Sequence, residues 1–344
     1  MGTLSLSART GEHAHLRALN AFRDLTAVAD LIELCFASAM DNEGRRYVSD
    51  MRRASRENGF LRWASRIAEN TTLPLTGYVW EQDGRIVGNA SLIPFRHRGK
   101  RIFLIANVAV HPDYRRRGIA RALTRRALEH AGEKKAAAVW LHVRDDNPGA
   151  IKLYRELGFQ EIARRTTWMA EANVSLQKTF DASKERGIRI VPRHPRYWSL
   201  QREWLRRIHP DDLAWYRPFD LDTLKPGFWN WLYLLFMDID LHQWAAVRGD
   251  QLLATLSWVP HGGRSETLYA ATGIGSAPNR RANEEKTETD VELSAEALTR
   301  LLLHARQYVG DPASLSLEYP TGEMTEAFLA AGFRERRTLL WMRV

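Results

Sequence analysis

The sequence is poor in cysteine and contains no long hydrophobic run. Its 344 residues include one cysteine, Cys35, which excludes an internal disulfide. The longest aromatic and apolar run, residues 228–237, is far shorter than the roughly 20 residues that a membrane-spanning helix needs. No basic start followed by an apolar stretch marks a signal peptide. We therefore expect a cytoplasmic protein with no membrane partner.

Residue patterns typical of metal sites are also scarce. His13 and His15 lie close together near the N-terminus, but no further ligand spacing of the zinc type accompanies them. Cys35 lies in an apolar helical stretch, residues 31–36, and is expected in a core rather than as a nucleophile. The sequence therefore predicts no metal site.

Positive charge exceeds negative charge only in the first half of the chain. Residues 1–170 hold 28 Lys and Arg against 18 Asp and Glu, whereas residues 171–344 hold 22 against 23. A basic face is typical of nucleic-acid-binding proteins, but no basic stripe here is interleaved with aromatic residues. A phosphorylated small molecule explains the excess more economically, so nucleic acid is not expected as a partner.

The chain repeats itself at the scale of a domain. The hairpin pattern of residues 78–94 recurs in residues 244–260 with a turn signal at the same place, and residues 154–159 align with residues 328–333. We therefore predict two similar domains, residues 1–172 and 188–344, joined by a polar linker over residues 173–187. Such a chain is expected to be a monomer, as an internal pseudo-dimer, or a homodimer.

The most informative segment runs from residue 108 to residue 121. Residues 102–110 have the pattern of an apolar strand, and residues 119–130 are amphipathic. The turn between them therefore lies at a helix N-terminus, where unpaired N–H groups and the helix dipole attract anions. Gly118 would let a phosphate approach the backbone, and Ala120 would keep the next turn narrow. The alternative is a solvated arginine run before a surface helix.

A second segment downstream has the signals of a capped helix. Residues 139–143 alternate like a strand, Asn147 suits the N-cap, Pro148 suits the first helical position, and Gly158 suits the stop. The two segments together resemble the GNAT acetyltransferase superfamily over roughly residues 15–170. Its acyl-CoA motif is matched by Arg115, Gly118 and Ala120, and its later motif by Asn147, Ala150, Leu153, Tyr154, Gly158 and Phe159.

The resemblance implies an α+β, three-layer architecture with two tandem GNAT-like folds, each a mixed, mostly antiparallel sheet flanked by helices. It implies acetyl-CoA as co-substrate and an N-acetyltransferase that moves the acetyl group to a primary amine of a small molecule by direct attack in a ternary complex. The residues expected to bind acetyl-CoA are Val108, Ala109, Val110, Arg115, Arg116, Arg117, Gly118, Ile119, Ala120, Arg121, Asn147, Ala150 and Tyr154. The alternatives are a protein acetyltransferase acting on a lysine or an N-terminus, and a non-catalytic acyl-CoA sensor.

Tyr154 is the candidate catalytic acid. The resemblance places its hydroxyl beside the thioester sulfur, where it would protonate the departing thiolate. A core tyrosine with a satisfied hydroxyl is the alternative.

His142 is the candidate catalytic base. It occupies the position of the glutamate in the Trp-Leu-Glu-Val-Arg pattern of N-terminal acetyltransferases, and its imidazole could accept the proton of the amine. Strand alternation would place Leu141 and Val143 on the opposite side. Asp145 or Asp146 as base, no base at all, or a half-buried structural histidine remain as alternatives.

The second copy has kept apolar positions and lost polar ones. Gly118 aligns with Glu284, whose carboxylate would repel a phosphate, and Tyr154 aligns with Phe328. Residues 282–290 form a polar run that is expected to be a loop. We therefore predict a degenerate second domain. Its aromatic segment, residues 215–236, is interpreted as core and interdomain packing or, alternatively, as a wall of the acceptor site.

Overall fold

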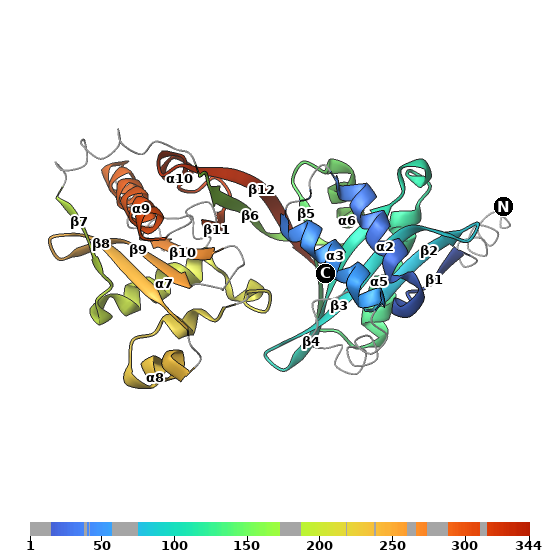
Figure 1. The fold of residues 1–344 in the computed structure, drawn as a ribbon, viewed down its shortest axis with the longest axis horizontal. Helices are drawn as coiled ribbons and strands as arrows, with labels where there is room; N and C mark the ends of the chain where they lie inside the picture. Colours follow the sequence, from blue (N-terminus) through green and yellow to red (C-terminus); the bar gives the residue numbers. More distant parts are fainter. Residues whose placement is uncertain are drawn as a thin grey trace. The chain divides into compact units, whose positions relative to one another are not determined.

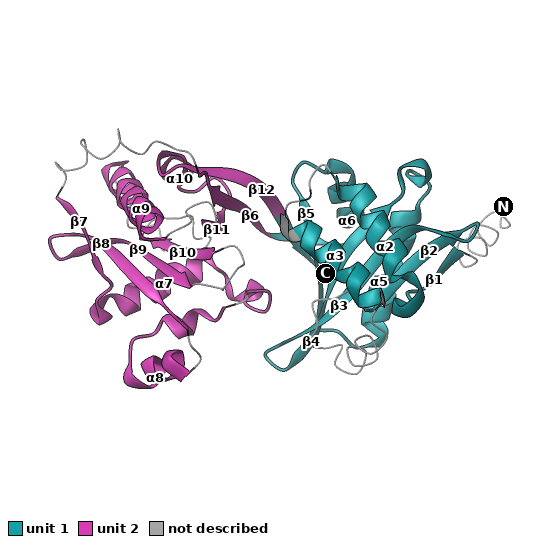
Figure 2. Ribbon diagram, viewed as in Figure 1, with its two compact units in different colours: residues 1–162, 340–344 teal, residues 163–339 magenta. Residues whose placement is uncertain are grey.

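The chain divides into two compact units (Figure 2). The computed structural model describes residues 15–37, 40, 42–56, 75–172, 187–217, 219–236, 239–259, 266–273, 288–309 and 315–344. Unit 1 comprises residues 1–162 and 340–344, and unit 2 comprises residues 163–339. Residues 173–186 of the expected linker lie outside the described residues.

Unit 1 is a sheet covered by helices on both faces (Figure 1). Its strands are β1 (Leu16–Ala18), β2 (Gly77–Gln82), β3 (Arg85–His97), β4 (Lys100–Val110), β5 (Ala138–Arg144) and the start of β6 (Gln160–Ala170). Its helices are α2 (Ala21–Phe36), α3 (Asn42–Arg56), the short 3₁₀ helix η2 (Pro112–Tyr114), α5 (Ile119–Glu133) and α6 (Pro148–Glu156). The expected strand before residue 110 and the expected helix after residue 118 are therefore confirmed.

The sheet of unit 1 is antiparallel except at one place. Strands β1, β2, β3 and β4 pair antiparallel in chain order, and β4 pairs parallel to β5. Side chains alternate across the sheet, as a strand requires. Val79 packs with α2 and α3 on one face, whereas its neighbours Tyr78 and Trp80 pack with α5 on the other. The predicted three-layer arrangement is confirmed for this unit.

Unit 2 repeats this plan. Its strands are β7 (Ile188–Pro192), β8 (His242–Arg248), β9 (Gln251–Val259), β10 (Glu266–Thr272), β11 (Leu315–Pro320) and most of β12 (Phe333–Arg343). Its helices are η5 (Pro195–Tyr197), α7 (Trp198–Ile208), η6 (Asp211–Leu213), η7 (Leu221–Leu224), α8 (Phe228–Phe236), α9 (Glu288–Tyr308) and α10 (Thr325–Ala330). Strands β7 to β10 pair antiparallel, and β10 pairs parallel to β11.

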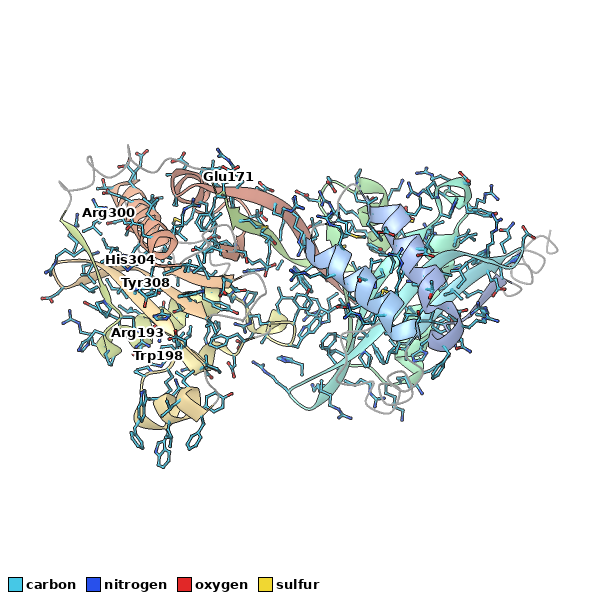
Figure 3. The ribbon with its side chains drawn as sticks, in the orientation of Figure 1. Glu171, Arg193, Trp198, Arg300, His304 and Tyr308 are labelled. Atoms are coloured by element: carbon cyan, nitrogen blue, oxygen red, sulfur yellow. The ribbon has the colours of Figure 1, made fainter. Side chains whose placement is uncertain are left out.

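One row of side chains on α9 contacts strands β7 and β8 at the edge of the unit 2 sheet (Figure 3). Arg300 donates to the carbonyl oxygen of Ile188 at 2.8 Å. His304 and Tyr308 follow at intervals of four residues, and their rings lie 5.3 and 5.4 Å from the ring of Trp244. Unit 1 has a matching pair, because the Tyr78 hydroxyl lies 2.8 Å from Nδ1 of His130 at the equivalent positions. The internal repeat is confirmed in this contact as well as in the hairpins.

The last strand of each repeat lies beside the fifth strand of the other repeat. Strand β6 pairs with β11 through residues 165–169, and the end of β12 lies next to β5. Val139 and Val344 exchange two backbone hydrogen bonds of 2.9 and 3.0 Å. The boundary between the compact units therefore follows residue 162, and residues 340–344 belong to unit 1. These boundaries differ from the expected ones at residues 172 and 188.

The structure corrects part of two expectations for the second half. No residue of α8 is buried, and Trp229 and Phe236 are 79% and 80% exposed, so the aromatic residues of this helix are not core. The preceding η7 helix fills the core instead, through Leu221 and Leu224. Residues 288–290 of the expected loop form the first turn of α9, and residues 282–287 lie outside the described residues.

Candidate active site

The turn before α5 has the geometry of an anion-binding nest. Arg116 and Gly118 both have positive φ, 64° and 81°, a pattern that turns successive N–H groups toward one point. The first hydrogen bond of the helix runs from the Ala122 N–H to the carbonyl oxygen of Gly118 at 3.0 Å. The N–H groups of residues 118–121 precede it and have no acceptor within the helix. The turn can therefore hold a phosphate group by its backbone.

Gly118 faces open space in this nest. A Cβ atom built on it would meet no heavy atom within 4 Å. This free space agrees with the expectation that a side chain at position 118 would occupy the room needed by a phosphate. The φ of +81° independently favours glycine. The residues present thus fit the pyrophosphate of CoA.

The arginines of the turn brace its backbone. Arg115 Nε donates to the carbonyl oxygen of Val110 at 3.2 Å, and Arg117 Nη2 donates to that of Asp113 at 2.9 Å. Arg121 forms an ion pair with Glu156 of α6. Arg116 is exposed. The backbone is consequently the best-formed anion site, and phosphate binding by these four side chains stays a prediction.

Strands β4 and β5 separate beside this turn. Their parallel pairing ends at Ile105 and Leu141, although β4 continues to Val110 and β5 to Arg144. Beyond these residues the backbone of residues 108–110 does not pair with β5, and we call this divergence of the two strands the opening. Such backbone can form hydrogen bonds with an extended chain that contains amide groups. The pantetheine arm of CoA is a chain of this kind.

Tyr154 points into the core that lies beneath this opening. It comes from α6, whose N-cap is Asn147 as predicted, with the Ala150 N–H donating to Asn147 Oδ1 at 3.1 Å. The tyrosine is 6% exposed and packs with Phe159, and no described residue hydrogen-bonds its hydroxyl. Burial raises the pKa of Tyr154 to about 12, so the hydroxyl is protonated near neutral pH. It can therefore donate a proton but cannot serve as a base.

His142 lies on the opposite face of β5 from Tyr154. Leu141 and Val143 pack in the same core cluster as Tyr154, which confirms the predicted alternation. The His142 ring lies 5.0 Å from the ring of Trp341, on β12. Sequence reasoning missed Trp341 because it is 199 positions away along the chain and reaches β5 only through the closing strand. Of the alternative bases, Asp146 pairs with Arg144, and the hydrogen bond from that guanidinium lowers its pKa.

Cys35 is half-buried beside the end of β4. Its thiol donates to the carbonyl oxygen of Val110 at 3.3 Å. Burial raises the pKa of this thiol, so the reactive thiolate is disfavoured. The structure therefore agrees with the interpretation that Cys35 is not a nucleophile.

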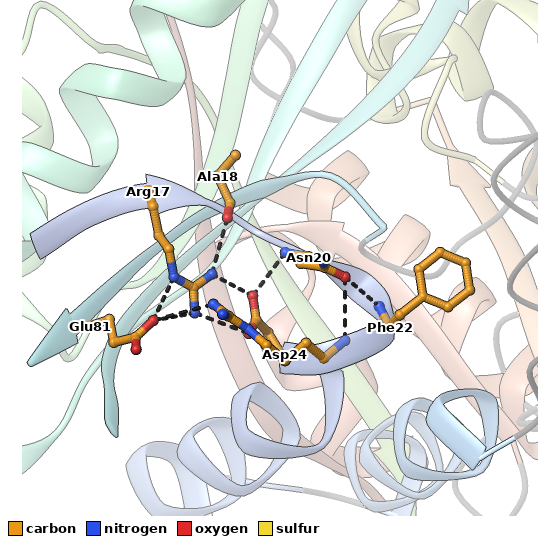
Figure 4. Close-up of polar contacts among 7 residues, drawn as sticks. Arg17, Ala18, Asn20, Phe22, Asp24 and Glu81 are labelled. Atoms are coloured by element: carbon orange, nitrogen blue, oxygen red, sulfur yellow. Dashed lines mark hydrogen bonds and ion pairs between the residues drawn. The ribbon is translucent and has the colours of Figure 1, made fainter. Parts of the chain in front are cut away.

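A separate cavity of ≈ 480 Å³ lies in unit 1 between α2 and the β2–β3 hairpin. Its floor is an ion-pair network around Asp24, which is 2% exposed (Figure 4). Asp24 accepts hydrogen bonds from Arg17, Arg23 and the backbone N–H of Asn20. Burial alone would raise the pKa of Asp24, but these hydrogen bonds together lower it. The network ties β1, α2 and β2 together through Glu81, which also pairs with Arg17.

Two further properties follow from the described part of the chain. No group of three or more His, Cys, Asp or Glu side chains there is arranged to hold a metal ion. None of the helices in those residues is long and apolar enough to span a membrane.

Comparison with known proteins gives consistent relatives. Residues 37–159 match the acetyltransferase (GNAT) family. The ribosomal protein bS18-alanine N-acetyltransferase of Escherichia coli is 42% identical over 62 residues, which are 18% of this chain and 42% of that protein. Mycothiol acetyltransferase of Saccharomonospora viridis is 33% identical over 115 residues, which are 33% of this chain and 36% of that protein. The matched segments thus span less than half of either relative.

Solved structures are similar over nearly the whole chain. One of them is a GCN5-related N-acetyltransferase from Sphaerobacter thermophilus, with a TM-score of 0.50 and 15% identity, covering 96% of this chain and 95% of that one. At this identity the similarity shows the fold alone. It agrees with the two-unit architecture described above.

Proposed function

Because residues 37–159 form a domain of the acetyltransferase (GNAT) family, we propose that the chain is an acetyl-CoA-dependent N-acetyltransferase with its active site in unit 1. One arrangement of three features carries this proposal. A backbone anion nest at Gly118 adjoins the opening between β4 and β5, and a buried, protonated tyrosine lies in the core beneath that opening. The three features are what a phosphorylated thioester substrate requires of a protein.

The geometry supports a set of residues that would hold acetyl-CoA. Backbone N–H groups of residues 118–121 would bind the pyrophosphate, and the backbone of residues 108–110 would bind the pantetheine arm and the thioester carbonyl. Asn147 and Ala150 would contribute by setting the start of α6, which carries Tyr154. When bound, acetyl-CoA supplies an acetyl group activated as a thioester.

Two side chains would move protons. Tyr154 holds a proton on its hydroxyl across the physiological pH range and would donate it at the sulfur side of the opening. His142, on the other face of β5, would accept the proton of the amine directly or through water. Their separation by the strand suits a reaction in which the proton is accepted on one side and donated on the other.

We infer that unit 2 does not bind acetyl-CoA. Phe328 stands where unit 1 has Tyr154, and its ring packs 5.0 Å from Trp168 and 5.2 Å from Tyr319. It offers no hydroxyl for proton donation. Residues 281–286, which correspond to the nest, lie outside the described residues. The alignment of Glu284 with Gly118 therefore rests on the sequence.

The proposed acceptor is a primary amine of a small molecule. The similarity to mycothiol acetyltransferase, over a longer stretch than the other relative, supports this choice. A protein N-terminus is the second candidate, supported by the 42% identity over 62 residues to a ribosomal protein bS18-alanine N-acetyltransferase.

A thiol-detection assay with acetyl-CoA tests the proposal. The wild-type chain is offered two panels, small primary amines and peptides with free N-termini, and release of CoA is measured. Acetylation within the first panel supports the small-molecule acceptor, and acetylation of peptides alone replaces it with the second candidate. Absence of both acetyl-CoA binding and CoA release would refute the proposed activity.

A further inference from the structure

Strand β4 contains one irregular position, Asn107, at the edge of the opening to β5. Opposite Ala90 of β3, the strand places two residues, Asn107 and Val108, where a regular ladder places one. Asn107 has a φ of +52°, in the left-handed region that asparagine enters more readily than alanine and most other non-glycine residues. The pairing with β5 ends at Ile105, two positions earlier. The bulge is therefore the point from which the backbone begins to line the opening.

Three hydrogen bonds hold Asn107 in this conformation. Its carbonyl oxygen accepts from Asn89 Nδ2 at 2.9 Å. Its own Nδ2 donates to the Tyr47 hydroxyl at 2.8 Å and to Ser91 Oγ at 3.5 Å. Asn89 and Ser91 are both fully buried and are joined to each other by a hydrogen bond of 3.2 Å. Both the backbone and the side chain of Asn107 are thus fixed from β3 and from α3.

Tyr47 connects the helical layer to the bulge. It lies on α3, and burial raises its pKa to about 12, so its oxygen is a neutral acceptor for the Asn107 amide. A buried hydrogen bond of this kind is retained because an unpaired amide in the same place would be costly. The Tyr47 hydroxyl therefore fixes the orientation of the Asn107 side-chain amide.

We propose that Tyr47, Asn89 and Ser91 are positioning residues that hold Asn107 in the left-handed conformation and so direct the backbone of residues 108–110 toward the acyl group and pantetheine of acetyl-CoA. A strained conformation persists only where its surroundings over-determine it, and such strain concentrates at functional sites. This inference rests on the proposed function of the opening. It assigns the three side chains an effect through the backbone, with no contact to the substrate.

Two substitutions at one position separate backbone conformation from side-chain chemistry. Asn107→Ala removes the amide and keeps a Cβ at positive φ, whereas Asn107→Gly removes the amide and permits that φ without strain. We expect calorimetry to give a Kd for acetyl-CoA that is at least about tenfold higher in Asn107→Ala than in wild type. The Kd of Asn107→Gly should lie within about threefold of the wild-type value. Equal weakening by both would overturn the proposal, because a residue that permits the left-handed φ would then bind acetyl-CoA no better than one that is strained by it.

Tyr47→Phe removes one hydrogen bond and keeps the ring. We expect it to weaken acetyl-CoA binding about three- to tenfold. Ser55→Ala is the matched control on the same helix, because Ser55 bonds to Thr26 of α2 at 2.8 Å and has no hydrogen bond to β4 among the described residues. Its affinity for acetyl-CoA should equal that of wild type. Equal affinities for Tyr47→Phe and Ser55→Ala would contradict the proposal.

Amide hydrogen exchange tests the positioning without any ligand. Faster exchange at residues 106–110 in Tyr47→Phe than in Ser55→Ala is expected, since only the first variant loosens the bulge. Unchanged exchange in both would refute the proposal even if acetyl-CoA were not a ligand. Failure of the wild-type chain to bind acetyl-CoA would instead refute the proposed function, so the two failures are distinguishable.

Discussion

Replacing Gly118 by alanine should affect stability and acetyl-CoA binding for two separate reasons. The added Cβ meets no heavy atom within 4 Å, so no clash with the protein is expected. At a φ of +81°, however, an alanine is strained by about 1–2 kcal/mol. For a domain of this size that strain lowers Tm by roughly 2–8 °C. The same Cβ enters the space over the nest and should also weaken binding.

Gly99 provides a matched control for the strain. Its φ is +74°, a Cβ there would also meet nothing within 4 Å, and it precedes β4 at the end of the strand away from the nest. Gly99→Ala should therefore lower Tm by a similar amount and leave the acetyl-CoA affinity unchanged. Gly118→Glu adds a carboxylate, and at about 4 Å in an effective dielectric of about 20 its repulsion of a phosphate is about 4 kcal/mol, or about 10³-fold in Kd.

Thermal unfolding and calorimetry on these variants give the two effects separately. The loss in Gly118→Glu should shrink as salt is added, because mobile ions screen the repulsion. If Gly118→Glu bound acetyl-CoA as tightly as wild type, the nest would not be the phosphate site. If Gly99→Ala weakened acetyl-CoA binding as much as Gly118→Ala, general destabilisation would explain the loss of affinity, and not the Cβ in the space over Gly118.

Four further outcomes are expected. Tyr154→Phe should lower kcat about 10²-fold with an unchanged Kd for acetyl-CoA, and unchanged turnover would leave the proton to water. If His142 accepts the amine proton, kcat/KM falls as the pH drops through the range of an imidazole, and an identical acid limb in His142→Gln would reject that role. Asp24→Asn should lower the free energy of unfolding by about 1.5–3 kcal/mol near neutral pH. Because the folded pKa of Asp24 is lowered, its stabilisation is present above the unfolded pKa and is lost as the pH falls through the folded pKa. Urea titrations of mutant and wild type should therefore converge in acid. A chain ending at residue 339 should lose stability in unit 1, since it lacks the buried Leu340 and Met342, and an unchanged thermal transition of that unit would contradict the strand assignment.

Much of the fold could be predicted because its signals are local. The strand, turn and helix around Gly118 are encoded within about 30 residues, and the cap at Asn147 within four. The two hairpins could be matched because alternation and turn residues recur at one spacing, and the structure confirms both. These local signals also placed His142 on the opposite face of β5 from Leu141 and Val143.

The features that could not be predicted depend on contacts between distant parts of the chain. Residues 340–344 carry no signal that they return to β5 and bring Trp341 to His142. The bulge at Asn107 follows from packing against β3 and α3, and an asparagine within an apolar strand was its only trace in the sequence. Helix α8 has the composition of a buried helix, yet its surroundings leave it exposed. Composition alone does not report which neighbours an element has.

Calorimetric titration of the wild-type chain with acetyl-CoA tests the central claim most directly, because it measures the number of sites as well as the affinity. One molecule bound per chain, with its affinity lowered about 10³-fold by Gly118→Glu, is the predicted result. Two sites per chain, one site that survives Gly118→Glu, or no binding would contradict the claim that the nest of unit 1 alone holds the co-substrate.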